Sequence, residues 1–139
     1  MAIWLLKTEP SVYSYDDLER DGETMWDGVT NAQALQNIRK MQNGDLAIIY
    51  HTGDERQAIG LADVTRGCYI NPEEENPKLA VCDVRAKRRL NNPVTLAQVK
   101  AHPHLQNWDL VRLARLSVVP VNDQQWRILQ QLSQEVKPS

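Results

Sequence analysis

The 139-residue sequence contains no phenylalanine, only two cysteines and only six glycines. No apolar run approaches the ~20 residues that a membrane-spanning helix needs, so we expect a soluble protein. Cys68 and Cys82 are too few for a disulfide scaffold and lack the close spacing of a metal site; we expect reduced, buried thiols. No glycine-rich phosphate loop follows the first apolar segment, which argues against a nucleotide-binding doubly wound fold.

Catalytic motifs are also missing. The three histidines, His51, His102 and His104, lie in neither an HExxH motif nor a Cys/His zinc pattern. No serine occupies a Gly-x-Ser-x-Gly elbow, and no cysteine has a histidine nearby in the sequence. We therefore expect no enzyme, no metal and no cofactor, although a triad assembled from distant segments stays open.

The length fits one domain, residues 1–139, with a single core. The opening MAIWLLKTEP has an apolar patch but neither a preceding basic region nor a following small-residue cleavage site, so we expect no signal peptide. A cytoplasmic protein of bacterial type is the simplest expectation.

The apolar pattern predicts a mixture of strands and helices. Strands are expected at 2–7, 46–51, 57–70, 79–90 and 115–121. Capping boxes at Ser14, Thr30 and Asn122, and a cap at Thr95, predict four helices. The second helix would span about 31–41, and the last would pack Trp126, Leu129, Leu132 and Val136 inward. This order favours an α+β domain with a largely antiparallel, curved sheet.

Charge is unevenly distributed, although the net charge is only −2. Acidic residues dominate 9–27, where Arg20 is the only cation, and basic residues dominate 85–115. The basic residues are Arg85, Lys87, Arg88, Arg89, Lys100, Arg112 and Arg115. They predict a locally basic surface for nucleic acid, and a solvated strand and helix face fits the pattern equally well.

The stretch MWDGVTN places Trp26 in what reads as a turn, just before a helix start. Free N–H groups at the helix start, together with Asp27, Asn31 and an indole face, would suit a flat, hydrogen-bonding heterocycle. The alternative is a core or hinge tryptophan that packs against the helix start.

The stretch IIYHTG ends a predicted strand in polar residues. Alternation would put Tyr50 on one face and His51 on the other, with Thr52 at the point where the strand leaves the sheet. These residues either line a pocket, or Tyr50 packs in the core and His51 only caps the turn.

Taken in order, these segments resemble the EVE domain family. The matching pieces are WLLKTEP, YSYDDL, WDGVTN, GDLAIIYHT, AIGLADV, VTLAQVK and RLSVVPV, which together cover nearly the whole chain. The resemblance implies a PUA-like pseudo-barrel of mostly antiparallel strands with helices packed over its ends, related to YTH and ASCH domains. It also implies a reader of modified bases rather than an enzyme.

Carried over by position, the resemblance implies a base pocket with Trp26 as the stacking wall. Its residues would be Lys7, Thr8, Glu9, Trp26, Asp27, Asn31, Tyr50, His51 and Thr52, with Arg115 and Ser117 close by. Thr30, Ala32 and Leu35 replace an Arg, a Tyr and a second Arg of the family pattern. Losing two guanidinium groups removes phosphate contacts.

Our leading hypothesis is a non-catalytic domain that binds RNA or DNA and reads a modified base. Its backbone contacts would come from Arg85, Lys87, Arg88, Arg112, Arg115 and Ser117. The alternative is an enzyme or sensor acting on a small free nucleotide or nucleoside-like metabolite, and a third reading is an interaction module without a pocket. Strand binding should weaken steeply with salt, whereas binding of a small neutral ligand should not.

Overall fold

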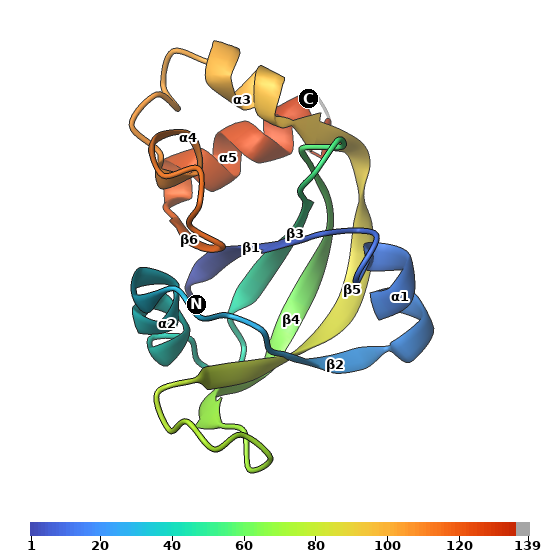
Figure 1. Cartoon of the computed structure of the whole chain (residues 1–139). Coiled ribbons are helices and arrows are strands. Elements are labelled where there is room, and N and C mark those ends of the chain that lie inside the picture. The colour runs from blue at the N-terminus through green and yellow to red at the C-terminus, as the bar shows by residue number, and fades with distance from the viewer. Residues whose placement is uncertain (136–139) are drawn as a thin grey trace.

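Six strands form one curved sheet in the computed structural model, which describes residues 1–135 (Figure 1). The strands are β1 (Ile3–Thr8), β2 (Glu23–Trp26), β3 (Leu46–His51), β4 (Gln57–Ile70), β5 (Ala80–Thr95) and β6 (Val118–Val121), in the spatial order β2-β5-β4-β3-β1-β6. Among the described strands only β1 and β3 pair in parallel, and the other four pairs are antiparallel. The expected α+β class with a mostly antiparallel sheet is confirmed.

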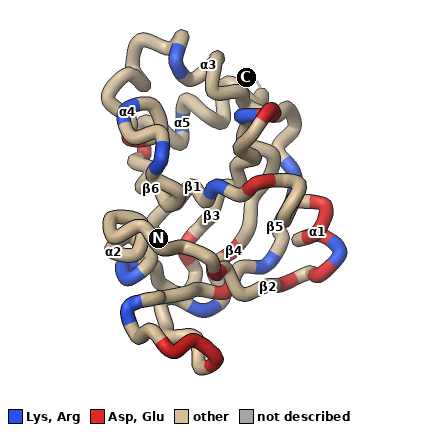
Figure 2. The backbone as a smooth tube through the Cα atoms, viewed as in Figure 1, with Lys and Arg blue, Asp and Glu red and all other residues tan. Residues whose placement is uncertain are grey.

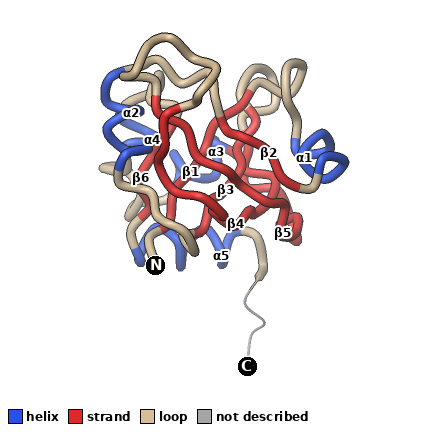
Figure 3. Tube along the Cα trace, turned by 90° about the horizontal axis from the view of Figure 1, so that it is seen from below, coloured by secondary structure: helices blue, strands red, loops and turns tan. Residues whose placement is uncertain are grey.

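Within residues 1–135, five short helices lie around this sheet. They are α1 (Tyr15–Asp21), α2 (Ala32–Arg39), α3 (Leu96–Ala101), α4 (Asp109–Arg112) and α5 (Asp123–Leu132). Helices α3, α4 and α5 gather over one end of the sheet, α1 lies beside β2 and β5, and α2 packs against β6, β4 and β5 (Figure 1). The view from below shows the strands in the middle, with α2 on one side of them and α1 on the other (Figure 3). None of the helices in residues 1–135 has the length and apolar character needed to cross a bilayer.

Local sequence signals set most helix starts. Ser14, Thr95 and Asn122 each form a capping box with the residue three positions on. The predicted cap at Thr30 is wrong: Asn31 caps α2, and its Oδ1 accepts the Ala34 N–H at 3.0 Å. Both residue types can cap, and only the backbone path decided between them. In α5, Leu129 is buried and Trp126 and Leu132 pack against the core, whereas Val136 lies outside the described residues.

Trp26 does not lie in a turn, as the sequence suggested. It ends β2, pairs with Cys82 of β5 and is only 6% exposed. β2 was missed because its segment, ETMW, has no apolar alternation and is held as a strand by pairing with a distant segment. The same limit applies to α4, a single turn that no periodic pattern marks.

The two cysteines differ in their surroundings. Cys82 is fully buried, as expected, but Cys68 is exposed, which corrects the expectation of two buried thiols. Both are unpaired. Burial raises the pKa of the Cys82 thiol to about 12, so this thiol stays protonated.

A buried carboxylate ties the start of the chain to the turn before β3. Asp45 is 4% exposed and accepts three N–H groups, from Ala2 N at 3.0 Å, Trp4 Nε1 at 3.1 Å and Gln42 N at 2.9 Å. These bonds satisfy a group that would otherwise be costly to bury. They hold β1 in place beside β3.

The register of β1 against β3 decides which side chains share a face. Lys7 lies opposite Tyr50, and Thr8 lies opposite His51. Because successive residues of a strand point to opposite faces, Lys7 and Tyr50 lie on one side of the sheet and Thr8 and His51 on the other. The end of β1 therefore contributes to two separate surfaces.

Candidate functional site

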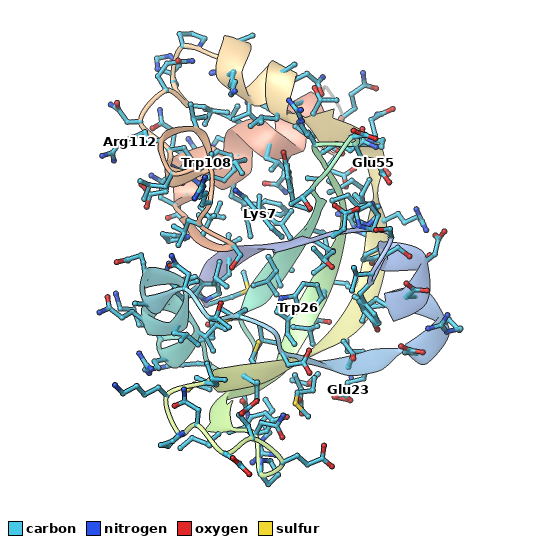
Figure 4. The ribbon with its side chains drawn as sticks, in the orientation of Figure 1. Lys7, Glu23, Trp26, Glu55, Trp108 and Arg112 are labelled. Atoms are coloured by element: carbon cyan, nitrogen blue, oxygen red, sulfur yellow. The ribbon has the colours of Figure 1, made fainter. Side chains whose placement is uncertain are left out.

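A cleft of about 460 Å³ opens beside Trp26. Residues 24–28, at the end of β2, form one side, and Thr8 of β1 and residues Val12 and Tyr13 of the β1–α1 loop form the other. Trp26 lies close to the middle of the ribbon, below β1 in this view (Figure 4). The cleft thus joins two chain segments on which the sequence predicted ligand contacts.

Two aromatic rings define the wall of the cleft. The rings of Tyr13 and Trp26 meet edge to face, with centroids 6.2 Å apart and planes at 86°. Since Trp26 is only 6% exposed, it lines the cleft but does not offer the open face that the sequence predicted. Tyr13 is half-buried and stands nearer to solvent.

The β1–α1 loop presents Tyr13 because it folds back after Pro10. The N–H groups of Val12 and Tyr13 both donate to Glu9 O at 2.9 Å, and Thr8 Oγ1 donates to Tyr13 O at 2.7 Å. Val12 is left 80% exposed at the rim of the cleft. An apolar residue so exposed beside two aromatics is available to contact a ligand.

The polar side chains at this cleft differ in whether they already have a hydrogen-bond partner. The hydroxyl of Tyr13 donates to Asp21 Oδ2 at 2.8 Å, and burial, with this carboxylate, raises the pKa of Tyr13. Asp27 is exposed and makes no side-chain hydrogen bond within residues 1–135. Its carboxylate is therefore a free acceptor for an amino group on the edge of a heterocycle.

The structure brings only part of the predicted base pocket together. Thr8, Trp26 and Asp27 share the cleft, but Lys7, Tyr50 and Thr52 line a second depression on the other face. Asn31 caps α2, which occupies its carbonyl oxygen. Glu9 accepts from Thr52 Oγ1 at 3.4 Å and from Ser11 Oγ at 3.2 Å, so its carboxylate holds the neighbouring turns.

His51 has a structural contact at each ring nitrogen. Nε2 accepts the backbone N–H of Tyr15 at 3.0 Å, so the ring hydrogen is on Nδ1, which faces Glu55 Oε1 at 3.0 Å. The ring is 6% exposed and lines a third depression, together with Glu55 (labelled in Figure 4). His51 thereby anchors the start of α1.

The start of α1 is held at one further place. The Tyr15 hydroxyl donates to Leu61 O at 2.7 Å, and its ring lies over Gly60. A Cβ on Gly60 would come within 2.5 Å of Tyr15 Cζ, so only glycine fits there. This packing fixes α1 and the loop that precedes it, and hence the position of Tyr13.

Most of the cations predicted to contact a nucleic-acid backbone are already paired. Lys87 bonds to Asp63 at 3.4 Å, Arg88 pairs with Glu135, and Arg112 bonds to Asp109 at 3.4 Å. The adjacent Arg89 pairs with Asp16 and Glu19 of α1. Within residues 1–135, Arg85 and Arg115 form no ion pair, and Ser117 receives the Lys7 N–H through its carbonyl at 2.9 Å.

The charge map agrees with this pairing (Figure 2). Acidic residues gather along α1, β2 and the β4–β5 loop, and basic residues are dispersed along β5 and around α3 and α4 (Figure 2). The surface is therefore not a continuous basic stripe. No group of three or more His, Cys, Asp or Glu side chains within residues 1–135 could hold a metal ion.

The sequence assigned no ligand contact to Val12, Tyr13 or Arg56, and it placed Lys100 only in the basic stretch 85–115. Val12 and Tyr13 line the Trp26 cleft, and Arg56 and Lys100 line the second depression. Pro10, which ends β1, was the available signal for a loop that turns back on the sheet. Nothing local places Arg56 and Lys100 in one depression, because α3 meets the β3–β4 turn, where Leu96 N–H donates to Arg56 O, only in the folded chain.

Known proteins share this architecture. The EVE domain family model matches residues 2–132. Human thymocyte nuclear protein 1 is 29% identical over 98% of this chain and 75% of its own length. The NMR structure of Rpa0253 from Rhodopseudomonas palustris has a TM-score of 0.92 at 35% identity, covering 99% of this chain and 97% of that one.

Two further structures bear on ligand and fold. Human THYN1 solved in complex with 5-methylcytosine-containing DNA has a TM-score of 0.88 at 28% identity, covering 99% of this chain and 100% of that one. The ASCH protein of Zymomonas mobilis shares the fold, with a TM-score of 0.58 at 11% identity over 94% of each chain. The predicted PUA-like fold is confirmed, and this chain belongs to the EVE domain family.

Proposed function

We propose that this protein is a non-catalytic domain that binds nucleic acid and reads a modified base in the Trp26 cleft. The observation that carries the proposal is the juxtaposition of the Tyr13 and Trp26 rings with the unpaired carboxylate of Asp27. The complex of human THYN1 with 5-methylcytosine-containing DNA supports it. We include both RNA and DNA as ligands, and we take residues 1–139 as one domain.

In this proposal the base lies against Tyr13 and reaches the edge of Trp26. Aromatic contact with a base contributes about 1–3 kcal/mol. A methyl group on the base would face the apolar floor formed by Trp26 and Met25, where its transfer from water is favourable by roughly 0.8 kcal/mol. Asp27 would accept a hydrogen bond from an exocyclic amino group. Asn31, which is exposed near the cleft, would contact a flanking nucleotide through its side-chain NH2 group.

The test compares the dissociation constants of matched oligonucleotides that differ in one base. Each sequence is made as single-stranded and duplex DNA and as RNA, with and without 5-methylcytosine or another modified base. We expect the wild type to prefer one modified base. The variants Tyr13→Leu, Trp26→Phe and Asp27→Asn should bring the ratio of the two constants toward one.

Trp126→Phe is the matched control, because Trp126 lies on α5, outside the cleft. It should keep the wild-type preference. Equal binding of every modified and unmodified pair by the wild type would sink the proposal. Circular dichroism of each variant separates loss of selectivity from loss of fold.

A second function has support from the ion pairs. Because Lys87, Arg88 and Arg112 are each paired with a carboxylate, few of the expected backbone contacts are available, which suits a small free nucleoside-like ligand. Titration with nucleosides at two salt concentrations separates the two functions. An affinity that is the same at both salt concentrations supports the small ligand.

For either function we propose a cytoplasmic location, in keeping with two unpaired cysteines.

A further inference from the structure

The second depression, of about 300 Å³, lies on the side of β1 opposite the Trp26 cleft. Figure 4 shows Lys7 and Trp26 on opposite sides of the β1 ribbon. Lys7 of β1, Arg56 of the β3–β4 turn and Lys100 of α3 converge on this depression, and Tyr50 and Leu110 supply part of its wall. Its volume is at the lower end of the range for small-molecule sites, roughly 300–1,000 Å³.

Cations outnumber carboxylates around this depression, where the carboxylate of Glu9 accepts from Thr52 Oγ1 at 3.4 Å. No aspartate or glutamate lines it, and within residues 1–135 Lys7, Arg56 and Lys100 form no ion pair. The ammonium of Lys7 donates to the carbonyl of Ala114 at 3.0 Å, and burial lowers the pKa of Lys7. Three cations that converge beside one carboxylate leave a net positive charge, which favours an anion.

Tyr50 provides a second, independent sign of a ligand. It is only 4% exposed, and its hydroxyl has no hydrogen-bond partner among the described residues. Every fully sealed side-chain N or O in residues 1–135 does have a partner. The hydroxyl of Tyr50 must therefore reach the open space of the depression, where it can donate to a ligand.

The surrounding backbone holds Arg56 at the mouth of the depression. Arg56 has a φ of 47°, in the left-handed region that residues other than glycine seldom occupy. Its Nε donates to Gly53 O at 3.2 Å, and its own carbonyl accepts the Leu96 N–H at 2.8 Å. Strained backbone that is pinned from two sides is a recurrent feature of ligand sites.

The apolar wall is also firmly placed. Trp108, at the start of α4, is 2% exposed, and its Nε1 donates to Pro120 O of β6 at 3.0 Å (Figure 4). This contact fixes α4 against the sheet and so positions Leu110 and Val111 in the wall. The depression is therefore cationic on one side and apolar on the other.

We propose that this depression binds a phosphate group, with its organic part against the apolar wall. Arg56 and Lys100 would contact the phosphate oxygens from the mouth, Lys7 would add charge from within, and the hydroxyl of Tyr50 would donate to one oxygen. The phosphate could belong to a free phosphomonoester or to the end of a nucleic-acid strand. The site is separate from the Trp26 cleft and does not depend on base reading.

The proposal is tested with three probes, followed by NMR chemical shifts and calorimetry. The probes are inorganic phosphate, phenyl phosphate, and an oligonucleotide with and without a 5′-phosphate. Phenyl phosphate should bind more tightly than inorganic phosphate and shift the amides around 50–56 and 96–100. A free phosphomonoester is the source if phenyl phosphate alone binds here, and a strand end is the source if the 5′-phosphate tightens oligonucleotide binding.

The variants Lys100→Gln and Arg56→Gly should each weaken phenyl phosphate binding about tenfold, the loss expected for one charge-assisted contact. Arg56→Gly suits the left-handed backbone, so it removes the side chain without adding strain. Tyr50→Phe should weaken binding less. Arg127→Gln, an exposed cation of α5 outside the depression, is the matched control and should bind as the wild type does.

Equal affinity in the wild type, Lys100→Gln and Arg56→Gly would overturn the proposal, as would failure of all three phosphate-bearing probes to bind. The variant Trp26→Phe separates failure of this phosphate site from failure of the proposed base reading. That variant should lose base selectivity and keep phosphate binding, so either site can fail without the other.

Discussion

The rings of Tyr13 and Trp26 meet edge to face at a centroid distance of 6.2 Å, and Trp26 is only 6% exposed. Replacing Tyr13 with alanine should therefore expose Trp26. We expect tryptophan emission to move to longer wavelength, without a change in the far-ultraviolet circular dichroism. An unchanged emission spectrum would show that Tyr13 does not shield the indole.

The Asp45 carboxylate accepts N–H groups from Ala2, Trp4 and Gln42. Asp45→Ala leaves these donors without their acceptor, so the free energy of unfolding should fall by about 3 kcal/mol. Urea denaturation measures this loss. Asp54→Ala, in an exposed turn, is the control and should change stability by less than about 0.5 kcal/mol.

The two thiols should react at very different rates. Cys68 is exposed, whereas Cys82 is buried and its pKa is raised to about 12. In native protein near pH 8, a thiol reagent should modify Cys68 quickly and Cys82 only after unfolding. Cys68→Ser should abolish the fast phase. Two thiols reacting equally fast in the native state would contradict the burial of Cys82.

Stability should fall at high pH because of Tyr69. Burial raises the pKa of Tyr69 to about 12, and its hydroxyl donates to Asp83 Oδ1 at 2.6 Å. The folded-state pKa is above the unfolded value of about 10, so the contribution is complete below pH ~10 and is lost as pH rises toward ~12. Urea midpoints across this range should fall less in Tyr69→Phe than in the wild type.

Backbone contacts, under the proposed function, should come from the cations that are not already paired. Arg85→Ala and Arg115→Ala should each reduce the slope of log K against log salt by about 0.9 for duplex DNA. Arg127→Ala, on α5, should leave the slope unchanged. If the three variants share one slope, Arg85 and Arg115 do not contact phosphate.

The sequence by itself determined the features that depend on neighbouring residues. Capping boxes located the starts of α1 and α5, and Thr95 marked α3. An apolar run located β3, the apolar pattern located β5, and the ordered motifs identified the family. These signals act within a few residues, so the linear order of the chain is enough to reveal them.

Only the tertiary structure decided the shape of the candidate sites. Pairing of β2 with β5 turned Trp26 from a presumed turn residue into the buried floor of a cleft. The parallel register of β1 with β3 separated Lys7 and Tyr50 from Thr8 and His51. Long-range contacts also paired Arg88 with Glu135 and brought Lys100 to Lys7. Each depends on segments far apart in the chain, and no local pattern records which segments will meet.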